Sequence, residues 1–341
     1  MQVFTEQRIF YQTGRTRSLT WRKEQLRRLL LSIEEHEEEL YQAFYQDLHK
    51  SRFETFITEI GATKKALRHA LKHLDRWAKP RRVRTPLTLL GCSSFIVREP
   101  YGNVLILGPF NYPFLTLIEP LIGAICAGNT AVIKPSEQTP NVGRVISKII
   151  ASFFPPHYIA CLEGDAELSA RLCALPFDLI FFTGSTRVGK QIMEAAAKNL
   201  SPVVLELGGK SPAILCKDAD VKRAAKRIAW GKFLNAGQTC VAPDYCLVYE
   251  PIKAAFLEAL KLEIRKLYGT DAATSEDYVR IVSNEHSERL RKILKEHKAE
   301  IVYGGNSSGR FVEPTVLSLK DASGPAMEEE LFGPILPVIG Y

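Results

Sequence analysis

The feature that most constrains the fold is a regular alternation of strand-like and helix-like segments between residues 101 and 198. Short apolar runs, typical of buried strands, alternate with longer segments whose apolar residues recur at helical spacing. The predicted order is strand 104–107, helix 115–127, strand 130–134, helix 142–153, strand 158–162, helix 168–175, strand 178–182 and helix 187–198. Such repeated units predict a mostly parallel, doubly wound sheet. Ligands bind such sheets at the carboxyl ends of the strands.

The residues before this block indicate helices followed by an arm. Apolar residues recur at helical spacing through residues 20–79, and Pro80 and Pro86 end that region. Residues 87–97 mix β-favouring residues with Gly91 and two serines. This composition predicts a hairpin arm that projects from the body of the protein.

A second α/β block is predicted from near Ser211 onward. The chain then finishes on residues 334–341, an apolar and strand-like run. Because domains rarely end on a segment suited to burial on both faces, the sequence is expected to be a truncated piece of a longer protein. The helices expected in this block cover residues 221–235, 252–266 and 285–296.

The bulk composition is that of a globular protein. At 341 residues, with 46% hydrophobic and 24% charged residues, the chain is large enough for two domains. Residues 1–12 lack the apolar core of a signal peptide. The most apolar stretch, 115–127, is interrupted by Glu119 and Pro120 and is shorter than the roughly 20 residues that span a bilayer. Seven cysteines without a Cys-x-x-Cys pair argue against a disulfide framework or a zinc site, so no metal is expected and a cytoplasmic location is predicted.

The positive charge is concentrated in one segment. The net charge is +7, and residues 64–84 alone hold nine Lys or Arg and one acid, Asp75. A basic stripe of this kind could bind nucleic acid. It has no interleaved aromatic residue apart from Trp77, so a stacking platform for bases is not indicated. The favoured interpretation is a solvated helix face that leads into a linker, and no nucleic-acid partner is expected.

One thiol and one carboxylate each stand among small residues. Cys240 ends the tetrapeptide Gly-Gln-Thr-Cys, and Glu206 follows the apolar run 203–205 and precedes Leu-Gly-Gly. This setting suggests a nucleophile and a base that meet in one cleft. The alternatives are an inert buried thiol and a structural acid at a helix start. The remaining cysteines are expected to be inert and buried, because most lie in apolar runs: Cys92, Cys126, Cys161, Cys173, Cys216 and Cys246.

Asn111 lies in the loop after the first strand of the block, where a ligand of the sheet would bind. Its side-chain amide could donate a hydrogen bond to an oxyanion, which is worth roughly 3 kcal/mol of transition-state stabilisation. The alternative is an Asn that only caps the turn before Pro113.

Two further segments have features of a dinucleotide site. Residues 183–189, Thr-Gly-Ser-Thr-Arg-Val-Gly, follow a strand and open a helix, where backbone N–H groups attract phosphate. The alternative is a glycine-capped turn. Lys134 and Glu137 follow the second strand, and an acid there can hold ribose hydroxyls. The alternative for Ser136 and Glu137 is a helix N-cap.

Several motifs then occur in a fixed order between residues 101 and 341. They are residues 111–113 with GAICAGNTAVIKP at 123–135, FTGSTRVG at 182–189, LELGGKSP at 205–212, GQTCVAP at 237–243 and EELFGP at 329–334. Their order and their residues resemble the motifs of the aldehyde dehydrogenase superfamily. The segments Cys-Val-Ala-Pro-Asp-Tyr and Asn-Tyr-Pro-Phe are most similar to its class 3 branch, which includes fatty and aromatic aldehyde dehydrogenases.

The resemblance implies a domain plan. Residues 1–80 and 100–207 would form a Rossmann-like, doubly wound NAD(P)-binding domain. Residues 81–99 would be the first part of a β-hairpin oligomerisation arm, which implies a homodimer if the full-length arm is present. Residues 208–341 would form a second α/β domain, the catalytic domain, incomplete at its C-terminus.

The resemblance also implies a role for each candidate residue. Cys240 would form a thiohemiacetal with an aldehyde, Asn111 and the Cys240 N–H would hold the oxyanion, and hydride would pass to NAD or NADP. Glu206 would activate the water that hydrolyses the resulting thioester. The residues implied to bind cofactor or substrate are Lys134 and Glu137 at the adenosine ribose, Gly184, Ser185, Val188 and Gly189 at the phosphates, Glu330 at the nicotinamide ribose, Phe332 at the nicotinamide and Tyr112 in the aldehyde tunnel.

One residue departs from the family pattern, and two other interpretations compete. Phe110 stands where the family commonly has Trp before the Asn, and because both are aromatic little change is expected. An acyl-phosphate or acyl-CoA reductase relative would keep the cysteine but needs no water-activating acid, so Glu206 argues against it. The other alternative is a truncated, inactive chain or a dinucleotide-binding partner protein.

Overall fold

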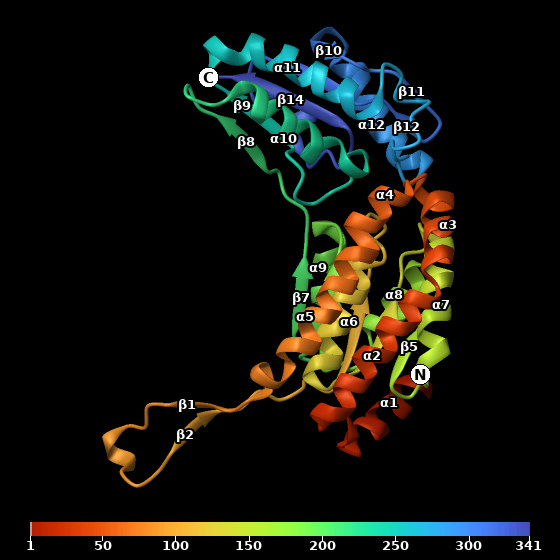
Figure 1. Cartoon of the computed structure of the whole chain (residues 1–341), viewed down its shortest axis with the longest axis vertical. Coiled ribbons are helices and arrows are strands. Elements are labelled where there is room, and N and C mark those ends of the chain that lie inside the picture. The colour runs from red at the N-terminus through yellow and green to blue at the C-terminus, as the bar shows by residue number, and fades with distance from the viewer. Residues whose placement is uncertain (1) are drawn as a thin grey trace. The chain divides into compact units, whose positions relative to one another are not determined.

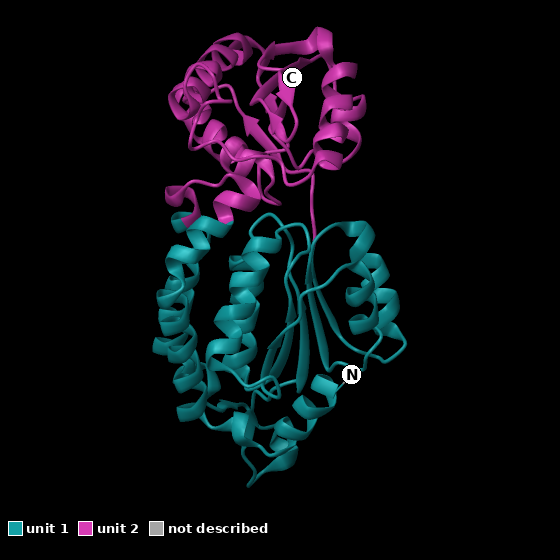
Figure 2. Cartoon of the chain, turned by 90° about the vertical axis from the view of Figure 1, so that its right-hand side faces the viewer, with its two compact units in different colours: residues 1–43, 56–206 teal, residues 44–55, 207–341 magenta. Residues whose placement is uncertain are grey.

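The computed structural model describes residues 2–341, which form two compact units (Figure 2). Unit 1 comprises residues 1–43 and 56–206, and unit 2 comprises residues 44–55 and 207–341. The division after residue 206 lies next to the boundary expected from the sequence. None of the helices described in 2–341 is both long enough and apolar enough to cross a membrane.

Residues 44–55 were expected to belong with the N-terminal helices, but they belong to unit 2. Their backbone carbonyls and one carboxylate accept hydrogen bonds from unit 2. The Arg280 N–H donates to the Leu48 carbonyl at 2.8 Å, and the Asn235 N–H donates to Glu54 Oε1 at 2.9 Å. These long-range bonds, rather than the local helical pattern, decide where the segment packs.

The sheet of unit 1 confirms the predicted doubly wound architecture. It has five parallel strands in the order β5-β4-β3-β6-β7. Every residue of β3 and β4 is buried, as expected for central strands covered on both faces. The strands are β3 (Asn103–Leu107), β4 (Thr130–Lys134), β5 (Ile159–Cys161), β6 (Leu179–Thr183) and β7 (Val203–Glu206).

Helices cover both faces of this sheet (Figures 1 and 2). α6 and α7 pack on one face beneath an outer layer of α2 and α5, and α8 and α9 pack on the other. α6 ends at Gly128, whose φ of 93° suits only glycine well and whose N–H donates to the carbonyls of Ala124 and Ile125. The helices of unit 1 are α1 (Gln2–Gln12), α2 (Leu19–Glu35), α5 (Gly61–Ala78), α6 (Leu115–Ala127), α7 (Pro140–Phe153), α8 (Ala166–Cys173) and α9 (Thr186–Ala197), and α3 (Glu37–Leu48) runs from unit 1 into unit 2.

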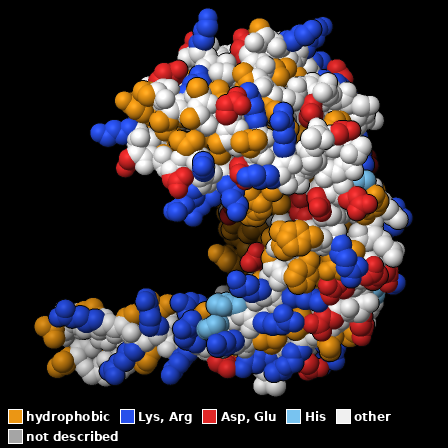
Figure 3. All heavy atoms as spheres, turned by 45° about the horizontal axis from the view of Figure 1, so that its top comes forward, with side chains coloured by type: hydrophobic (Ala, Val, Ile, Leu, Met, Phe, Trp, Pro, Cys, Tyr) orange, Lys and Arg blue, Asp and Glu red, His pale blue; other side chains and the backbone are white. Residues whose placement is uncertain are grey.

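A two-stranded arm extends from unit 1 (Figure 1). β1 (Arg81–Val83) pairs antiparallel with β2 (Ser94–Ile96). The first strand therefore lies before residue 87, where the predicted hairpin began. Residues 87–89 instead form a 3₁₀ turn, because the chain bends after Pro86 and the Leu89 N–H donates to its carbonyl at 2.9 Å. Figure 3 shows basic and hydrophobic side chains along this arm.

Unit 2 contains a second five-stranded sheet, in the order β10-β13-β14-β9-β8. Only the β10–β13 pair is antiparallel. The apolar run at the end of the sequence forms β14, a buried strand between β13 and β9. The strands are β8 (Pro212–Leu215), β9 (Tyr245–Val248), β10 (Ile301–Tyr303), β13 (Thr315–Leu319) and β14 (Ile335–Gly340), and the helices are α4 (Arg52–Thr55), α10 (Val221–Phe233), α11 (Glu250–Tyr268), α12 (Asn284–Glu296) and α13 (Pro325–Glu328).

Candidate active site

The predicted site residues of unit 1 lie along the carboxyl edge of its sheet. In the parallel register Leu107 pairs with Lys134 and with Phe182, and Thr183 pairs with Glu206. The loop that follows β3, the end of β4, the turn after β6 and the last residue of β7 therefore share one edge. This is the edge at which doubly wound sheets bind ligands.

The loop after β3 is held tightly against the first turn of α6. Asn111 and Tyr112 are both buried, and the Tyr112 carbonyl accepts from the Thr116 hydroxyl at 2.7 Å and from its N–H at 3.1 Å. Glu59 Oε2 accepts from the Leu115 N–H at 2.9 Å, so a carboxylate stabilises the positive end of α6. The oxyanion role of Asn111 stays a prediction, and so does the place of Tyr112 in an aldehyde tunnel.

Glu137, in the loop after β4, is held by a hydrogen bond from a lysine and does not cap a helix. The buried Lys134 ammonium donates to Glu137 Oε2 at 2.8 Å and to the Pro135 carbonyl at 3.1 Å. α7 begins only at Pro140, with Thr139 at the cap position, so the helix-cap alternative for Glu137 is wrong. The pair presents a positioned, half-exposed carboxylate, which suits ribose hydroxyls.

The turn after β6 is built around Gly184 and Ser185. A Cβ on Gly184 would lie 2.4 Å from the Phe182 ring, so only glycine fits. Ser185 caps α9, and its Oγ accepts from the Val188 N–H at 3.3 Å. The cap is therefore serine rather than the glycine of the alternative interpretation. The Ser185 hydroxyl proton stays available to donate to a phosphate at this helix N-terminus. Gly189 lies at the end of the first turn of the helix.

Glu206 is the exposed last residue of β7. Its backbone carbonyl accepts from the Gly184 N–H at 3.0 Å, which ties the acid to the turn after β6. The alternative of a structural acid at a helix start is wrong, because Glu206 ends a strand.

The predicted nucleophile lies in the loop that leads into β9, and therefore at the amino ends of the parallel strands of unit 2 rather than at their carboxyl ends. Cys240 is exposed and lies between α10 and β9. The turn before it is strained, because the non-glycine residues Asn235 and Ala236 have φ values of 53° and 51°. A Cβ on Gly237 would lie 2.3 Å from the Gly333 carbonyl oxygen. The Cys240 loop therefore packs against the residue that directly follows Phe332.

Buried hydrogen bonds fix the backbone beside Cys240. The Gln238 side chain donates to the carbonyls of Asn235 at 3.1 Å and Arg280 at 3.2 Å, and it accepts from the Val282 N–H at 2.9 Å. A thiol held on a rigid, exposed loop has the setting that a nucleophile needs, so the alternative of a buried thiol at Cys240 is wrong.

Glu330 and Phe332 lie in the segment that precedes β14. A Cβ on Gly208 would lie 1.9 Å from Glu330 Oε2, so glycine is needed for this close approach. The Gly209 N–H also bonds to the Glu330 carboxylate, and partial burial raises the pKa of Glu330. Phe332 has an unusual φ of 46°, and its carbonyl lies 2.8 Å from His286 Nε2.

Sequence reasoning missed a charged cluster beside this segment: Lys210, Lys232, Asp244, His286 and Arg289. Lys210 and Asp244 stand inside the recognised motifs LGGKSP and CVAPDY, which was the available signal. Lys232 carried no signal, because one lysine on a predicted helix is usually solvated.

The expectation for the other six cysteines is wrong in part. Cys173 and Cys246 are buried, but Cys92 and Cys216 are exposed. Cys92 lies in the arm, where Leu89 and Leu90 are themselves exposed, and Cys216 lies just after the end of the edge strand β8. Within residues 2–341 no three His, Cys, Asp or Glu residues gather in a way that could hold a metal ion.

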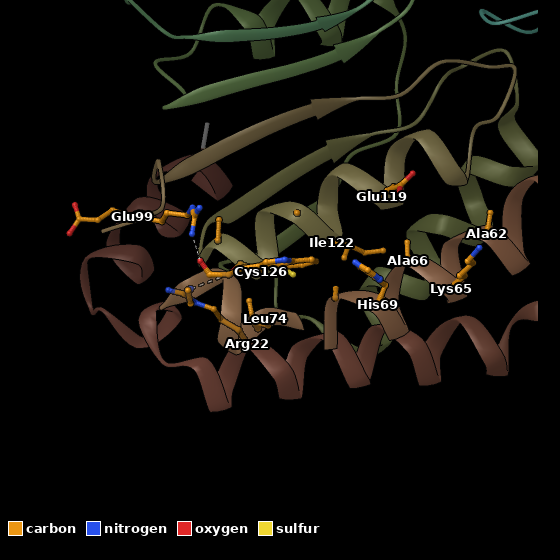
Figure 4. A pocket seen from close by; sticks show the side chains of 16 residues that line it. Arg22, Ala62, Lys65, Ala66, His69, Leu74, Glu99, Glu119, Ile122 and Cys126 are labelled. Atoms are coloured by element: carbon orange, nitrogen blue, oxygen red, sulfur yellow. Dashed lines mark hydrogen bonds between the residues drawn. The ribbon is translucent and has the colours of Figure 1, made fainter. Parts of the chain in front are cut away.

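A separate groove of about 620 Å³ runs between α5 and α6 of unit 1 (Figure 4). Small and apolar side chains such as Ala66 and Ile122 line it, and Arg22 closes one end by donating to the Cys126 carbonyl at 3.1 Å. None of the predicted catalytic or cofactor residues lines the groove.

Comparison with known proteins gives a consistent result. The family model for the aldehyde dehydrogenase family matches residues 9–341. The chain is 48% identical to the 4,4'-diaponeurosporen-aldehyde dehydrogenase of Staphylococcus aureus, over 100% of this chain and 74% of the relative. It is 40% identical to the aldehyde dehydrogenase, dimeric NADP-preferring, of Canis lupus familiaris, over 99% of this chain and 75% of the relative.

Solved structures agree with this. The substrate-bound state of Staphylococcus aureus AldH matches with a TM-score of 0.97 and 48% identity, over 100% of this chain and 75% of that chain. Other matching structures contain NAD+. The motif order, the two α/β units and the extent of these matches lead to one conclusion: the chain belongs to the aldehyde dehydrogenase family.

Proposed function

We propose that this chain oxidises an aldehyde to its carboxylic acid with NAD+ or NADP+ through a covalent adduct on Cys240. The observation that carries the proposal is the packing of the Cys240 loop on Gly333, beside Phe332. This packing supports a position of the Cys240 thiol near Phe332, the residue proposed to contact the nicotinamide, and hydride transfer needs such proximity.

The residues fit a dinucleotide. Lys134 holds Glu137 at the end of a strand, Ser185 caps a helix start, and Gly208 makes room for the Glu330 carboxylate. Glu137 would bind the adenosine ribose, Ser185 the phosphates and Glu330 the nicotinamide ribose. When bound, the dinucleotide supplies the hydride acceptor.

The chain's own residues would carry the remaining steps. The Cys240 thiol releases its proton to solvent as the sulfur attacks the aldehyde carbon, so that a C–S bond forms and the carbonyl π electrons move to the oxygen. The Asn111 amide and the Cys240 N–H donate to the oxyanion. Loss of hydride converts the adduct into a thioester. Glu206 takes a proton from water, the water oxygen attacks the thioester carbon, the C–S bond breaks and the thiol regains its proton.

Glu206 also argues against the reductase alternative, which has no hydrolytic step.

Two further features of the proposal come from the relatives' names. One relative is named for 4,4'-diaponeurosporen-aldehyde and the other as dimeric and NADP-preferring, so that aldehyde and both cofactors are candidates for this chain. A cytoplasmic location is also part of the proposal, because seven cysteines without a Cys-x-x-Cys pair suit a reducing compartment.

The test is a comparison of three variants, with NADH formation followed by absorbance in the presence of long-chain and aromatic aldehydes. Cys240→Ala should abolish dehydrogenation while leaving NAD+ binding intact, because it removes only the nucleophile. Glu206→Gln should keep a pre-steady-state NADH burst and slow the steady state by about a hundredfold, the usual contribution of a general base. Cys216→Ala, which removes another exposed thiol of unit 2, is the control.

Turnover of Cys240→Ala near the parent rate would remove Cys240 from the mechanism. Loss of the burst in Glu206→Gln would show that Glu206 acts before hydride transfer, and another base would be needed for hydrolysis.

A further inference from the structure

The segment from Glu329 to Phe332 has an irregular backbone that side chains hold in place. The Leu331 N–H donates to Asp244 Oδ1 at 3.0 Å, and Arg289 donates to the Leu331 carbonyl. The Glu329 carbonyl accepts from Lys210 Nζ at 2.8 Å. Because residues 329–332 belong to no helix or strand, backbone hydrogen bonds of regular structure do not fix this segment, and these side chains decide its conformation.

Asp244 is the centre of this arrangement. Its side chain is almost fully buried, and both carboxylate oxygens are used. Oδ1 accepts from Leu331, and Oδ2 accepts from Lys210 Nζ at 2.5 Å. Lys210 in turn also donates to the Ala326 carbonyl at 3.0 Å. The carboxylate and the lysine together bridge the loops before β8, β9 and β14.

A second lysine faces the same carboxylate. Lys232 on α10 is fully buried, and its Nζ lies 3.8 Å from Asp244 Oδ1. Nζ has no hydrogen-bond partner among the described residues. A buried cation of this kind needs a counter-charge, and Asp244 supplies it.

We propose that Asp244, with Lys210, positions the Glu330–Phe332 segment so that Glu330 and Phe332 meet the nicotinamide half of the cofactor. This inference rests on the proposed function. None of the positioning residues touches the cofactor. They act by holding one backbone conformation, which lowers the ordering cost of binding.

The inference predicts a defect confined to one half of the dinucleotide. AMP would use only residues such as Lys134 and Glu137 of unit 1, whereas NAD+ would also use the segment held by Asp244. The measurement is the Kd of the full chain for NAD+ and for AMP by titration calorimetry, with KM for NAD+ and kcat where turnover is present.

Asp244→Ala removes the acceptor for Leu331 and should weaken NAD+ binding about tenfold or more, while the Kd for AMP changes less than about twofold. Asp244→Asn keeps an amide oxygen that can accept from Leu331, so it should recover much of the NAD+ affinity. A residue that only stabilised the fold would give no such recovery, because both variants leave the lysines without a counter-charge. Glu258→Gln, which breaks an exposed ion pair with Lys261 in the same unit, is the matched control.

Circular dichroism checks that each variant folds. If Asp244→Ala does not fold, Lys210→Met decides by the same criterion, since it releases the Glu329 and Ala326 carbonyls and its side chain is partly exposed. Equal NAD+ affinity in the folded variant and the parent would overturn the inference alone. A parent chain that binds neither NAD+ nor AMP would overturn the proposed function as well.

Discussion

At the scale of single residues, Lys232 shows the sharpest conflict between charge and burial. Burial lowers its pKa from 10.5 to about 8. Asp244 opposes that shift, and Lys210 adds to it. Cys246 and Glu330 also face the lysine and favour its charged form. The folded protein therefore loses this proton at a lower pH than the unfolded chain does.

This difference predicts how stability depends on pH. Between about pH 8 and 10.5 the unfolded state keeps a proton on Lys232 that the folded state has lost, so the free energy of unfolding rises with pH. Below pH 8 both states are protonated and this contribution is constant. The unfolding free energy of the parent minus that of Lys232→Met should therefore increase as pH rises through this window.

Urea unfolding at a series of pH values measures that difference. Lys266→Met, which removes an exposed lysine paired with Glu263 on α11, is the control and should show no such trend. A difference between parent and Lys232→Met that stays flat or falls with pH would contradict the prediction.

At the scale of elements, the loop before β8 controls the position of Glu330. Gly208→Ala would place a methyl group 1.9 Å from Glu330 Oε2. Because the carboxylate ends a flexible side chain, we expect Glu330 to swing away while the fold survives, with a change in unfolding free energy below about 1 kcal/mol. The Kd for NAD+ should rise about tenfold through loss of one charged hydrogen bond.

Gly209→Ala is a close control for that substitution, because the nearest heavy atom to its Cβ is 3.9 Å away and its N–H is kept. Calorimetric titration of both variants with NAD+ gives the answer. Similar affinities for Gly208→Ala and Gly209→Ala would show that Glu330 does not contribute to binding.

The two units place their site residues at opposite ends of parallel strands. In unit 1 the candidates follow β3, β4 and β6 or end β7, and in unit 2 Cys240, Glu330 and Phe332 precede β9 and β14. The carboxyl-end rule for doubly wound sheets therefore locates the first set only. In unit 2 the site depends on loops whose conformation comes from buried charge and strained turns.

At the scale of the whole molecule, the exposed apolar side chains of the arm lead us to predict that the chain self-associates. Leu87 and Leu90 are 84% and 88% exposed at its tip, and Phe95 on β2 is also exposed. Apolar side chains gathered on a thin, two-stranded ribbon favour burial against another surface. We propose that a second copy of this chain provides that surface.

Leu90→Asp should therefore shift the chain from dimer to monomer, because a charge would be buried at the contact. Sedimentation equilibrium measures the shift. Leu262→Asp, the same substitution at an exposed leucine of α11, should leave the dimer intact. A chain that is monomeric before substitution, or a Leu90→Asp variant that still dimerises, would exclude the arm as the contact.

Much of unit 1 could be predicted because its information is local. The apolar runs at 115–127 and 130–134 coincide with α6 and β4, since helical and strand periods are properties of neighbouring residues. Glycines such as Gly184 mark turns that admit no side chain, and the motif around Cys240 identified the family. Helices, strands and turns can be predicted from the sequence where the residues that determine them lie within a few positions of one another.

Only the tertiary structure decided the rest. The transfer of residues 44–55 to unit 2, the exposure of Cys92 and Cys216, and the burial of Lys232 against Asp244 all depend on partners far away in the sequence. The sequence by itself determined the doubly wound sheet and proposed the candidate reactive residues. Burial and hydrogen-bond partners are set by strand order and packing, and no local pattern encodes them.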